Sequence, residues 1–212
     1  MITIYHLATS RSERVIWLME ELGLQYNLER FAREPNMLAP ASLRAIHPLG
    51  KSPIIRDGDT VLVESGAILE YIIQRHGRGK FSVPASSPDY PRYLQWMHFA
   101  EGSAMTQLLL HLFLGGLITG VDQSMPMVAV MKERTASMLR YIDDELDTRL
   151  YFAGDSFTAA DIMMVYPYQM VTGFLQMDMS VYPNTRNYLE RIGLRPAYRK
   201  AMEIANPPAK SA

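Results

Sequence analysis

Two serine residues stand where the sequence predicts a helix to begin. Ser10 opens "SRSERVIWLMEELG", and Ser65 opens "SGAILEYIIQRHG" directly after Glu64. Free backbone N–H groups and the helix dipole at such a start favour an anion, and a hydroxyl there can donate a hydrogen bond to one. Both serines also suit a plain helix cap, since Glu13 follows Ser10 at the spacing of a capping box. Each position therefore indicates either anion binding or helix capping.

The sequence contains no cysteine among its 212 residues. This excludes disulfides, thiolate metal ligands and a protein-borne redox thiol, so any thiol chemistry must come from a bound molecule. His98 and Glu101 share a helical face, but a metal needs more ligands than this pair supplies. No metal cofactor is expected.

The charged residues are balanced, with 21 basic and 22 acidic side chains and a net charge of −1. Nucleic acids and anionic membranes demand a clustered basic surface, so neither is an expected partner. The start "MITIYHL" lacks the basic and apolar segments of a signal peptide, and the most apolar run, residues 107–120, is shorter than a membrane span. We expect a cytoplasmic protein without a membrane span.

Hydrophobic periodicity predicts an α/β domain over residues 1–79. Asp57-Gly58 favours a hairpin turn with positive φ at both central positions, so two of the strands are antiparallel. Gly23 and Gly77 end the two longer helices. The predicted order is strand 2–7, helix 10–23, strand 26–31, short helix 40–46, a two-stranded hairpin within 52–64, and helix 65–77.

Composition changes after residue 79, where glycine, serine and proline cluster in a predicted linker over 80–90. No strand pattern returns, so residues 91–212 form a predicted all-α domain. One helix start is marked clearly, because Thr158 and Asp161 have the spacing of a capping box. The helical patterns cover 91–114, 127–149, 158–174, 183–193 and 196–205.

Pro53 stands inside "IHPLGKSPII", at what otherwise reads as the start of a strand. Proline cannot donate to a sheet ladder and is confined to edges, strand starts and bulges. An edge-strand proline that blocks aggregation is one interpretation.

Several segments together resemble the cytosolic glutathione transferases. They are "SRSERVIWLMEELGLQYNL", "IHPLGKSPII", "VESGAILEYI", "FTAADIMM" and "RPAYRKAM", and they span the whole chain. The motifs "SRSER" and "IHPLGKSP" are most similar to a branch found in fungi and bacteria. The resemblance implies a thioredoxin-like domain of order β-α-β-α-β-β-α with a cis proline, followed by an all-helical domain.

The resemblance also implies a site for glutathione as co-substrate. Ser52-Pro53 would be a cis peptide, with the Ser52 backbone pairing with the cysteinyl part of the tripeptide. Glu64 would face the ammonium group and Ser65 the γ-glutamyl carboxylate. The remaining candidate ligands are Lys51 and His47 for the glycyl carboxylate, and Arg11.

The family's chemistry requires a thiolate, and a free cysteine-type thiol has a pKa of about 8.5. Lowering that pKa by roughly two units takes about 2.7 kcal/mol, which one hydrogen bond to a charged group, about 1.5–3 kcal/mol, can supply. Ser10 is the leading candidate donor, and Tyr5 resembles the tyrosine that other classes use. Ser12 and Thr9 stay open as alternatives.

The acceptor pocket expected from the resemblance lies between the domains. Its candidate residues are Met105, Leu108, His111 and Tyr166. Fifteen methionines suit a pocket for varied apolar molecules, although most of them are ordinary core by expectation.

The resemblance favours a transferase that adds the glutathione thiolate to small hydrophobic electrophiles, in detoxification. Two alternatives stay open: a glutathione-dependent peroxidase or disulfide reductase on the same scaffold, and a non-catalytic binding or assembly module. Retention of the candidate ligands argues against the last of these. A homodimer is the expected assembly.

Overall fold

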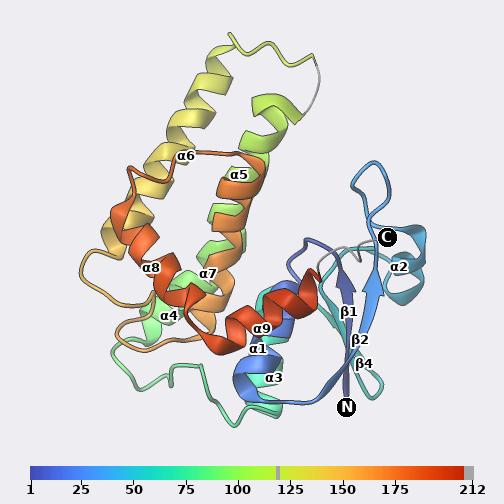
Figure 1. Cartoon of the computed structure of the whole chain (residues 1–212). Helices are drawn as coiled ribbons and strands as arrows, with labels where there is room; N and C mark the ends of the chain where they lie inside the picture. Colours follow the sequence, from blue (N-terminus) through green and yellow to red (C-terminus); the bar gives the residue numbers. More distant parts are fainter. Residues whose placement is uncertain (118–119, 208–212) are drawn as a thin grey trace. The chain divides into compact units, whose positions relative to one another are not determined.

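The computed structural model describes residues 1–117 and 120–207 (Figure 1). Residues 118–119 and 208–212, which belong to the apolar run and to the predicted second domain, lie outside the described part. Within that part the chain packs as two compact units. Unit 1 holds residues 1–82 and 192–207, and unit 2 holds residues 83–117 and 120–191. The domain limits at residues 79 and 91 stay a prediction.

Unit 1 is built on a four-stranded sheet of order β2-β1-β3-β4. Strands β1 (Ile2–Leu7) and β2 (Tyr26–Phe31) are parallel, whereas β3 (Ile54–Asp57) pairs antiparallel with β1 and with β4 (Thr60–Val63). Parallel neighbours need a crossover connection, and helix α1 (Glu13–Leu22) supplies it. The predicted order of strands and helices along the chain and the antiparallel hairpin are confirmed.

Helices cover both faces of the sheet in unit 1 (Figure 1). Helices α1, α3 (Ser65–Arg75) and α9 (Pro196–Ala205) lie on one face, and the short α2 (Ala41–Ile46) lies on the other. Side chains spaced three and four residues apart on α1 and α3 point inward and are fully buried, which is the periodicity that predicts these helices. They include Val15, Ile16, Leu18, Ile68, Leu69 and Ile72.

Helix α9 is fastened to α1 by charged and aromatic contacts. Arg195 donates from Nε and Nη2 to the two carboxylate oxygens of Glu21, over 2.7 and 2.8 Å. The rings of Trp17 and Tyr198 meet edge to face with centroids 4.8 Å apart. A two-pronged arginine–carboxylate pair fixes orientation as well as distance. These contacts hold α9, the last described helix, against α1, the first.

Two details of unit 1 differ from the sequence prediction. Helix α1 begins at Glu13 with Ser12 as its N-cap residue, not at Ser10, because residues 10–12 form a tighter turn in which the Ser10 carbonyl accepts from Glu13 N–H at 3.1 Å. The hairpin loop is Gly58-Asp59, since Asp57 pairs with Thr60. Among the described residues of this loop only Gly58, at φ 58°, takes the left-handed conformation.

The described part of unit 2 consists of helices and loops with one isolated β-bridge, between Tyr151 and Gly154, so the predicted helical character is confirmed. Several helices change type along their length. The predicted helix 91–114 is α4 (Tyr90–Phe99), a π-helical segment η1 (Ala100–Met105), α5 (Thr106–Leu112) and a second π segment, η2 (Phe113–Leu117). The others are α6 (Pro126–Glu145), α7 (Ala159–Gln169) with η3 (Met170–Phe174), and α8 (Pro183–Gly193), whose last two residues belong to unit 1. No helix in the described ranges is long and apolar enough to cross a bilayer.

The predicted capping box at the start of α7 is confirmed, and it forms part of a buried network. Thr158 Oγ1 accepts from Ala160 N–H, while the Asp161 carboxylate accepts from the backbone N–H groups of Thr158 (2.8 Å) and Phe152 (3.0 Å) and from the Tyr188 hydroxyl (3.2 Å). Burial raises the pKa of Asp161 to about 6, although these donated bonds act in the opposite direction. The carboxylate joins three segments of unit 2.

The backbone N–H groups of Phe152 and Thr158 donate to different oxygens of the Asp161 carboxylate. Asparagine has only one side-chain oxygen, so Asp161→Asn leaves one buried donor unsatisfied and should lower the free energy of unfolding by about 1–3 kcal/mol. Asp155→Asn alters an exposed carboxylate nearby and should change stability by less than about 0.5 kcal/mol. Urea unfolding at pH 7, followed by circular dichroism, measures both. Equal stability of the two variants would contradict the role given to Asp161.

Candidate active site

Three serine hydroxyls meet where β1 ends and α1 begins. Ser10 Oγ lies 2.8 Å from Ser12 Oγ and 3.3 Å from Ser52 Oγ, and it also accepts from Ser12 N–H at 3.3 Å. Ser52 in turn donates to the Tyr5 carbonyl at 3.3 Å. Ser10 and Ser12 are buried and Ser52 is half-buried. Two residues far apart in sequence, Ser10 and Ser52, are thus brought together at the amino end of a ten-residue helix.

A buried histidine lies behind these hydroxyls. His6 Nδ1 is 2.7 Å from Ser12 Oγ, and His6 Nε2 is 2.9 Å from the carbonyl oxygen of Ala205 on α9. Burial lowers the pKa of His6, the Ala205 bond acts against that shift, and the positive charge of Arg30 adds to it. The neutral imidazole is therefore the favoured form.

Arg33 fixes the loop that carries Ser10. Its guanidinium donates to the carbonyl oxygens of Ala8 (2.9 Å), Thr9 (2.8 Å) and Met37 (2.7 Å). Thr9 has φ 51°, a left-handed conformation that is uncommon for residues other than glycine. Because such a conformation persists only where neighbours hold it, the bonds from Arg33 explain how Thr9 keeps it beside Ser10.

The start of α3 is a second place suited to an anion. Ser65 is buried at the first residue of this eleven-residue helix, and its Oγ accepts from Arg14 Nη1 at 3.4 Å. Glu64 just before it is exposed and has φ 74° and ψ 118°, a sparsely populated backbone conformation. Strain of this kind costs about 1–3 kcal/mol and gathers at ligand sites. Ser65 is the first helical residue and not the N-cap, and the N-cap residue Glu64 makes no side-chain capping bond. The cap interpretation of Ser65 therefore loses support.

The loop before β3 contributes the other predicted ligands. The Ser52-Pro53 peptide is cis, as predicted. Lys51 is exposed, and His47 is half-buried with Nδ1 accepting from Leu49 N–H at 3.3 Å. Arg11 is half-buried in the turn before α1. Their roles toward a ligand stay predictions.

Tyr5 lies on the opposite face of β1 from His6. Its ring packs with Leu43 and Ile54 in the buried cluster under α2, and its hydroxyl accepts from Arg56 Nε at 3.0 Å. Side chains alternate between the two faces of a strand, so adjacent residues point apart. The Tyr5 hydroxyl is therefore bonded to Arg56 on the α2 side of the sheet, the face opposite His6 and Ser12.

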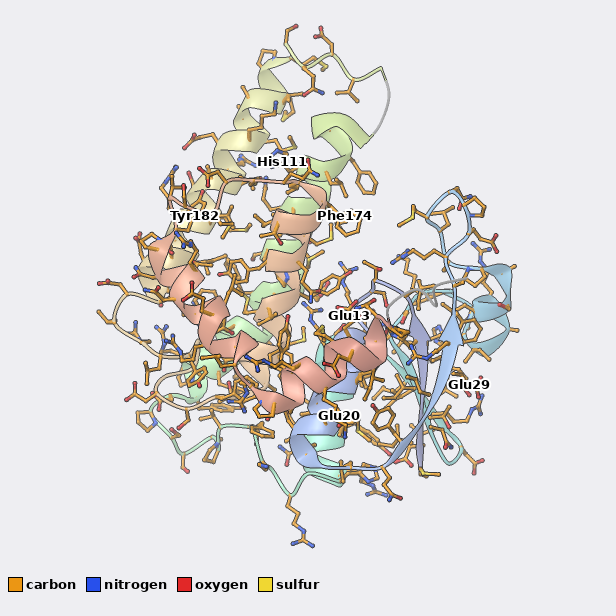
Figure 2. All side chains as sticks on the ribbon, in the orientation of Figure 1. Glu13, Glu20, Glu29, His111, Phe174 and Tyr182 are labelled. Atoms are coloured by element: carbon orange, nitrogen blue, oxygen red, sulfur yellow. The ribbon has the colours of Figure 1, made fainter. Side chains whose placement is uncertain are left out.

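The four predicted acceptor residues all belong to unit 2. Met105, Leu108 and Tyr166 are buried, which equally suits a core role, while His111 on α5 is half-buried (Figure 2). Burial and the positive charge of Lys132 lower the pKa of His111. Their part in an acceptor pocket stays a prediction.

Sequence reasoning named Ser10 and Ser52 but did not single out His6, Arg14 or Arg33. The alternation of side chains along β1 places His6 on the face covered by α1 and α9, and this alternation is the one signal that could have suggested it. Nothing local marks Arg33 as the residue holding the loop. Among the described residues, no group of three or more His, Cys, Asp or Glu side chains is arranged to hold a metal ion.

Comparison with known proteins identifies the family. The family described as "Glutathione S-transferase, N-terminal domain" matches residues 4–80, and "Glutathione S-transferase, C-terminal domain" matches residues 128–191. Glutathione S-transferase 3 of Schizosaccharomyces pombe is 31% identical over 96% of this chain and 87% of its own. The chain belongs to the glutathione S-transferase family.

Other members of this glutathione S-transferase family are similar over nearly the whole chain. Glutathione S-transferase 1 of Saccharomyces cerevisiae is 27% identical over 97% of this chain and 95% of its own. The crystal structure of a glutathione S-transferase from Actinobacillus pleuropneumoniae has a TM-score of 0.87 at 31% identity, covering 97% of this chain and 93% of that one. The predicted thioredoxin-like domain followed by helices is confirmed as this family's fold.

Replacing Arg33 by methionine should loosen the loop at Ala8 and Thr9, because three hydrogen bonds from a charged donor are lost at a partly exposed site. We expect the free energy of local opening to fall by about 1 kcal/mol. Amide hydrogen exchange of residues 8–12 measures this, with Arg134→Met, which removes an exposed arginine from α6, as the control. Unchanged exchange in this loop would show that Arg33 does not hold it.

Proposed function

We propose that the protein is a glutathione transferase that stabilises the glutathione thiolate at Ser10 and adds it to electrophilic hydrophobic molecules. The observation that carries this proposal is the position of the Ser10 hydroxyl, in the turn directly before α1 and 3.3 Å from Ser52 Oγ. A hydroxyl there can donate to a thiolate, and the helix dipole favours the negative charge. Membership of the glutathione S-transferase family supports the proposal.

The tripeptide is held by residues on the edges of unit 1. The Ser52 backbone pairs with the cysteinyl part, and Ser65, at the start of α3, receives the γ-glutamyl carboxylate. Glu64 faces the ammonium group, and its exposed carboxylate directly before Ser65 supports this role. Lys51 and His47 supply donors for the glycyl carboxylate, and Arg11 is a further proposed glutathione ligand. The crystal structure of a homologue from Lodderomyces elongisporus, described as having two GSH per subunit, has a TM-score of 0.82 at 22% identity.

Ser10 is the better candidate than Tyr5 for the thiolate donor. The Tyr5 hydroxyl accepts from Arg56 on the α2 side of the sheet, whereas the Ser10 hydroxyl lies beside Ser52. One hydrogen bond to a charged group supplies about 1.5–3 kcal/mol, enough for a shift in thiol pKa of roughly one to two units.

The acceptor and the assembly rest on family resemblance. Met105, Leu108, His111 and Tyr166 are the proposed acceptor residues, the proposed partner is a small hydrophobic electrophile, and the proposed assembly is a homodimer. A protein without cysteine cannot form a mixed disulfide with its own side chains, which disfavours disulfide reduction through a protein thiol. Glutathione-dependent peroxidase activity on the same scaffold remains the alternative enzymatic outcome.

The purified protein should conjugate glutathione to chlorodinitrobenzene faster than it reduces hydroperoxides or a mixed disulfide. Ser10→Ala should raise the pKa of the bound thiol by about one to two units, because the hydrogen bond to the thiolate is lost. At a pH below that pKa, kcat/KM for conjugation should therefore fall by about 10- to 100-fold. Ser86→Ala, which removes an exposed hydroxyl, serves as the control. Dominant hydroperoxide or disulfide turnover would favour the alternative enzyme, and glutathione binding without any turnover would favour a binding module.

The pKa of bound glutathione separates Ser10 from Tyr5. Thiolate absorbance in the near ultraviolet, titrated against pH, should give a pKa raised by about one to two units in Ser10→Ala and nearly unchanged in Tyr5→Phe. A thermal melt of each variant reports any loss of folding. If Tyr5→Phe shifts the pKa and Ser10→Ala does not, the donor role passes to Tyr5.

A further inference from the structure

A row of buried polar groups runs inward from Ser10. Ser10 Oγ is 2.8 Å from Ser12 Oγ, Ser12 Oγ is 2.7 Å from His6 Nδ1, and His6 Nε2 is 2.9 Å from the Ala205 carbonyl oxygen. The three side chains are only 5%, 0% and 1% exposed. Binding glutathione at Ser10 uses the outer hydroxyl alone. The row therefore contains two polar side chains, Ser12 and His6, to which glutathione binding assigns no role.

The chemistry of the groups fixes the direction of the hydrogen bonds in this row. The Ala205 carbonyl only accepts, so His6 Nε2 carries a proton. Because the imidazole is neutral, Nδ1 accepts, and Ser12 donates its single hydroxyl proton to it rather than to the Leu7 carbonyl, which is 3.5 Å away. Ser10 has one hydroxyl proton and two acceptors within reach, Ser12 Oγ at 2.8 Å and Ser52 Oγ at 3.3 Å. Because Ser12 uses its own proton toward His6, the shorter contact needs the Ser10 proton, and Ser10 donates to Ser12 in this arrangement. Ser10 Oγ accepts from Ser12 N–H at 3.3 Å, which leaves one lone pair on this oxygen for a ligand.

We propose that His6 is the proton acceptor for the glutathione thiol, reached through the hydroxyls of Ser10 and Ser12. The resting arrangement presents an acceptor, Ser10 Oγ, to the incoming S–H group. His6 and Ser12 do not touch glutathione and act on it through Ser10, as positioning residues. This inference rests on the proposed function, in which the glutathione thiol lies at Ser10.

Three proton transfers make up the step, and their charges balance. The thiol S–H bond breaks as its proton passes to Ser10 Oγ, the original Ser10 proton passes to Ser12 Oγ, and the original Ser12 proton passes to His6 Nδ1. The products are a thiolate and an imidazolium, and both serines stay neutral hydroxyls. Ser10 now donates to the thiolate. After the sulfur attacks an electrophile, the three proton transfers run in reverse. They carry a proton from His6 back to the leaving group, the product or solvent.

The surroundings of His6 favour protonation of its imidazole only when the glutathione thiolate forms nearby. Burial and the charge of Arg30 on β2 keep the imidazole neutral in the free protein. Arg30 Nη1 also donates to the Ala205 carbonyl at 3.4 Å. Glu13, on α1 (labelled in Figure 2), accepts from Asn206 at 3.1 Å. A thiolate at Ser10 adds a negative charge that offsets Arg30, and the Nε2–H bond to Ala205 strengthens once the ring is charged. The thiol and the imidazole then titrate as one coupled pair.

Nuclear magnetic resonance of protein labelled with ¹⁵N in its five histidines tests the proposal directly. The spectra are recorded with glutathione and with S-methylglutathione, which has no thiol proton, at a pH where near-ultraviolet absorbance shows the bound thiolate to be formed. The His6 ring nitrogens should move to imidazolium positions with glutathione and stay neutral with S-methylglutathione. His6→Gln assigns the signal, and if that variant does not fold, single Gln variants of the other four histidines assign it by elimination.

Ser12 variants test the link between the two ends of the row. Ser12→Ala should leave His6 neutral with glutathione bound and raise the pKa of the bound thiol by about one unit, a tenfold loss of thiolate at neutral pH. Ser12→Thr keeps the hydroxyl and should restore both signals. His98→Gln, on the exposed face of α4, is the control, and melting temperatures verify that each variant is folded.

A thiolate that forms while His6 stays neutral would reject the relay and leave the proposed function intact. An unchanged thiol pKa in folded Ser12→Ala would do the same. If glutathione does not bind, or binds without thiolate absorbance, the proposed function itself fails and the relay fails with it.

Discussion

The hydrogen bond from His6 to the Ala205 carbonyl joins the first strand to the last helix across 199 residues of sequence. A carbonyl oxygen can only accept, so this bond decides which imidazole nitrogen carries the proton and leaves the other to accept from Ser12. The orientation of Ser12 and then of Ser10 follows. Because the bond needs α9 in place, the two-pronged pair of Arg195 with Glu21, which holds α9 on α1, also supports the start of α1.

Much of the fold could be predicted because local sequence carries it. Apolar residues three and four apart mark α1 and α3, Gly23 ends α1 at φ 65°, and the capping box of Thr158 and Asp161 begins α7. The π-helical segments η1, η2 and η3 escaped prediction, since the pattern of apolar residues continues through them. The sequence predicts α1 to begin three residues early, because the spacing of Ser10 and Glu13 suits a capping box whereas residues 10–12 form a separate turn before the helix.

The candidate site was predictable in its outer residues and not in its inner ones. Ser10, Ser52 and Ser65 lie at helix starts or in the proline loop, where residue type and spacing show in the sequence. His6 and Arg33 act through bonds to backbone carbonyl oxygens, and a carbonyl group has no sequence signature. The positive φ of Glu64 was equally hidden, since glycine or asparagine would have been the expected residue there.

The alternation of side chains along β1 separates the two candidate thiolate donors. Residues along β1 alternate between faces, so Tyr5 points to the cluster under α2, and His6 points to the face covered by α1 and α9. The thiolate that we propose at Ser10 would lie beside Ser12 and His6, whereas the Tyr5 hydroxyl would first have to give up its bond from Arg56 on the α2 side. A serine donor would need polar residues behind it, and the pairing of Ser12 with His6 supplies them while both side chains stay buried.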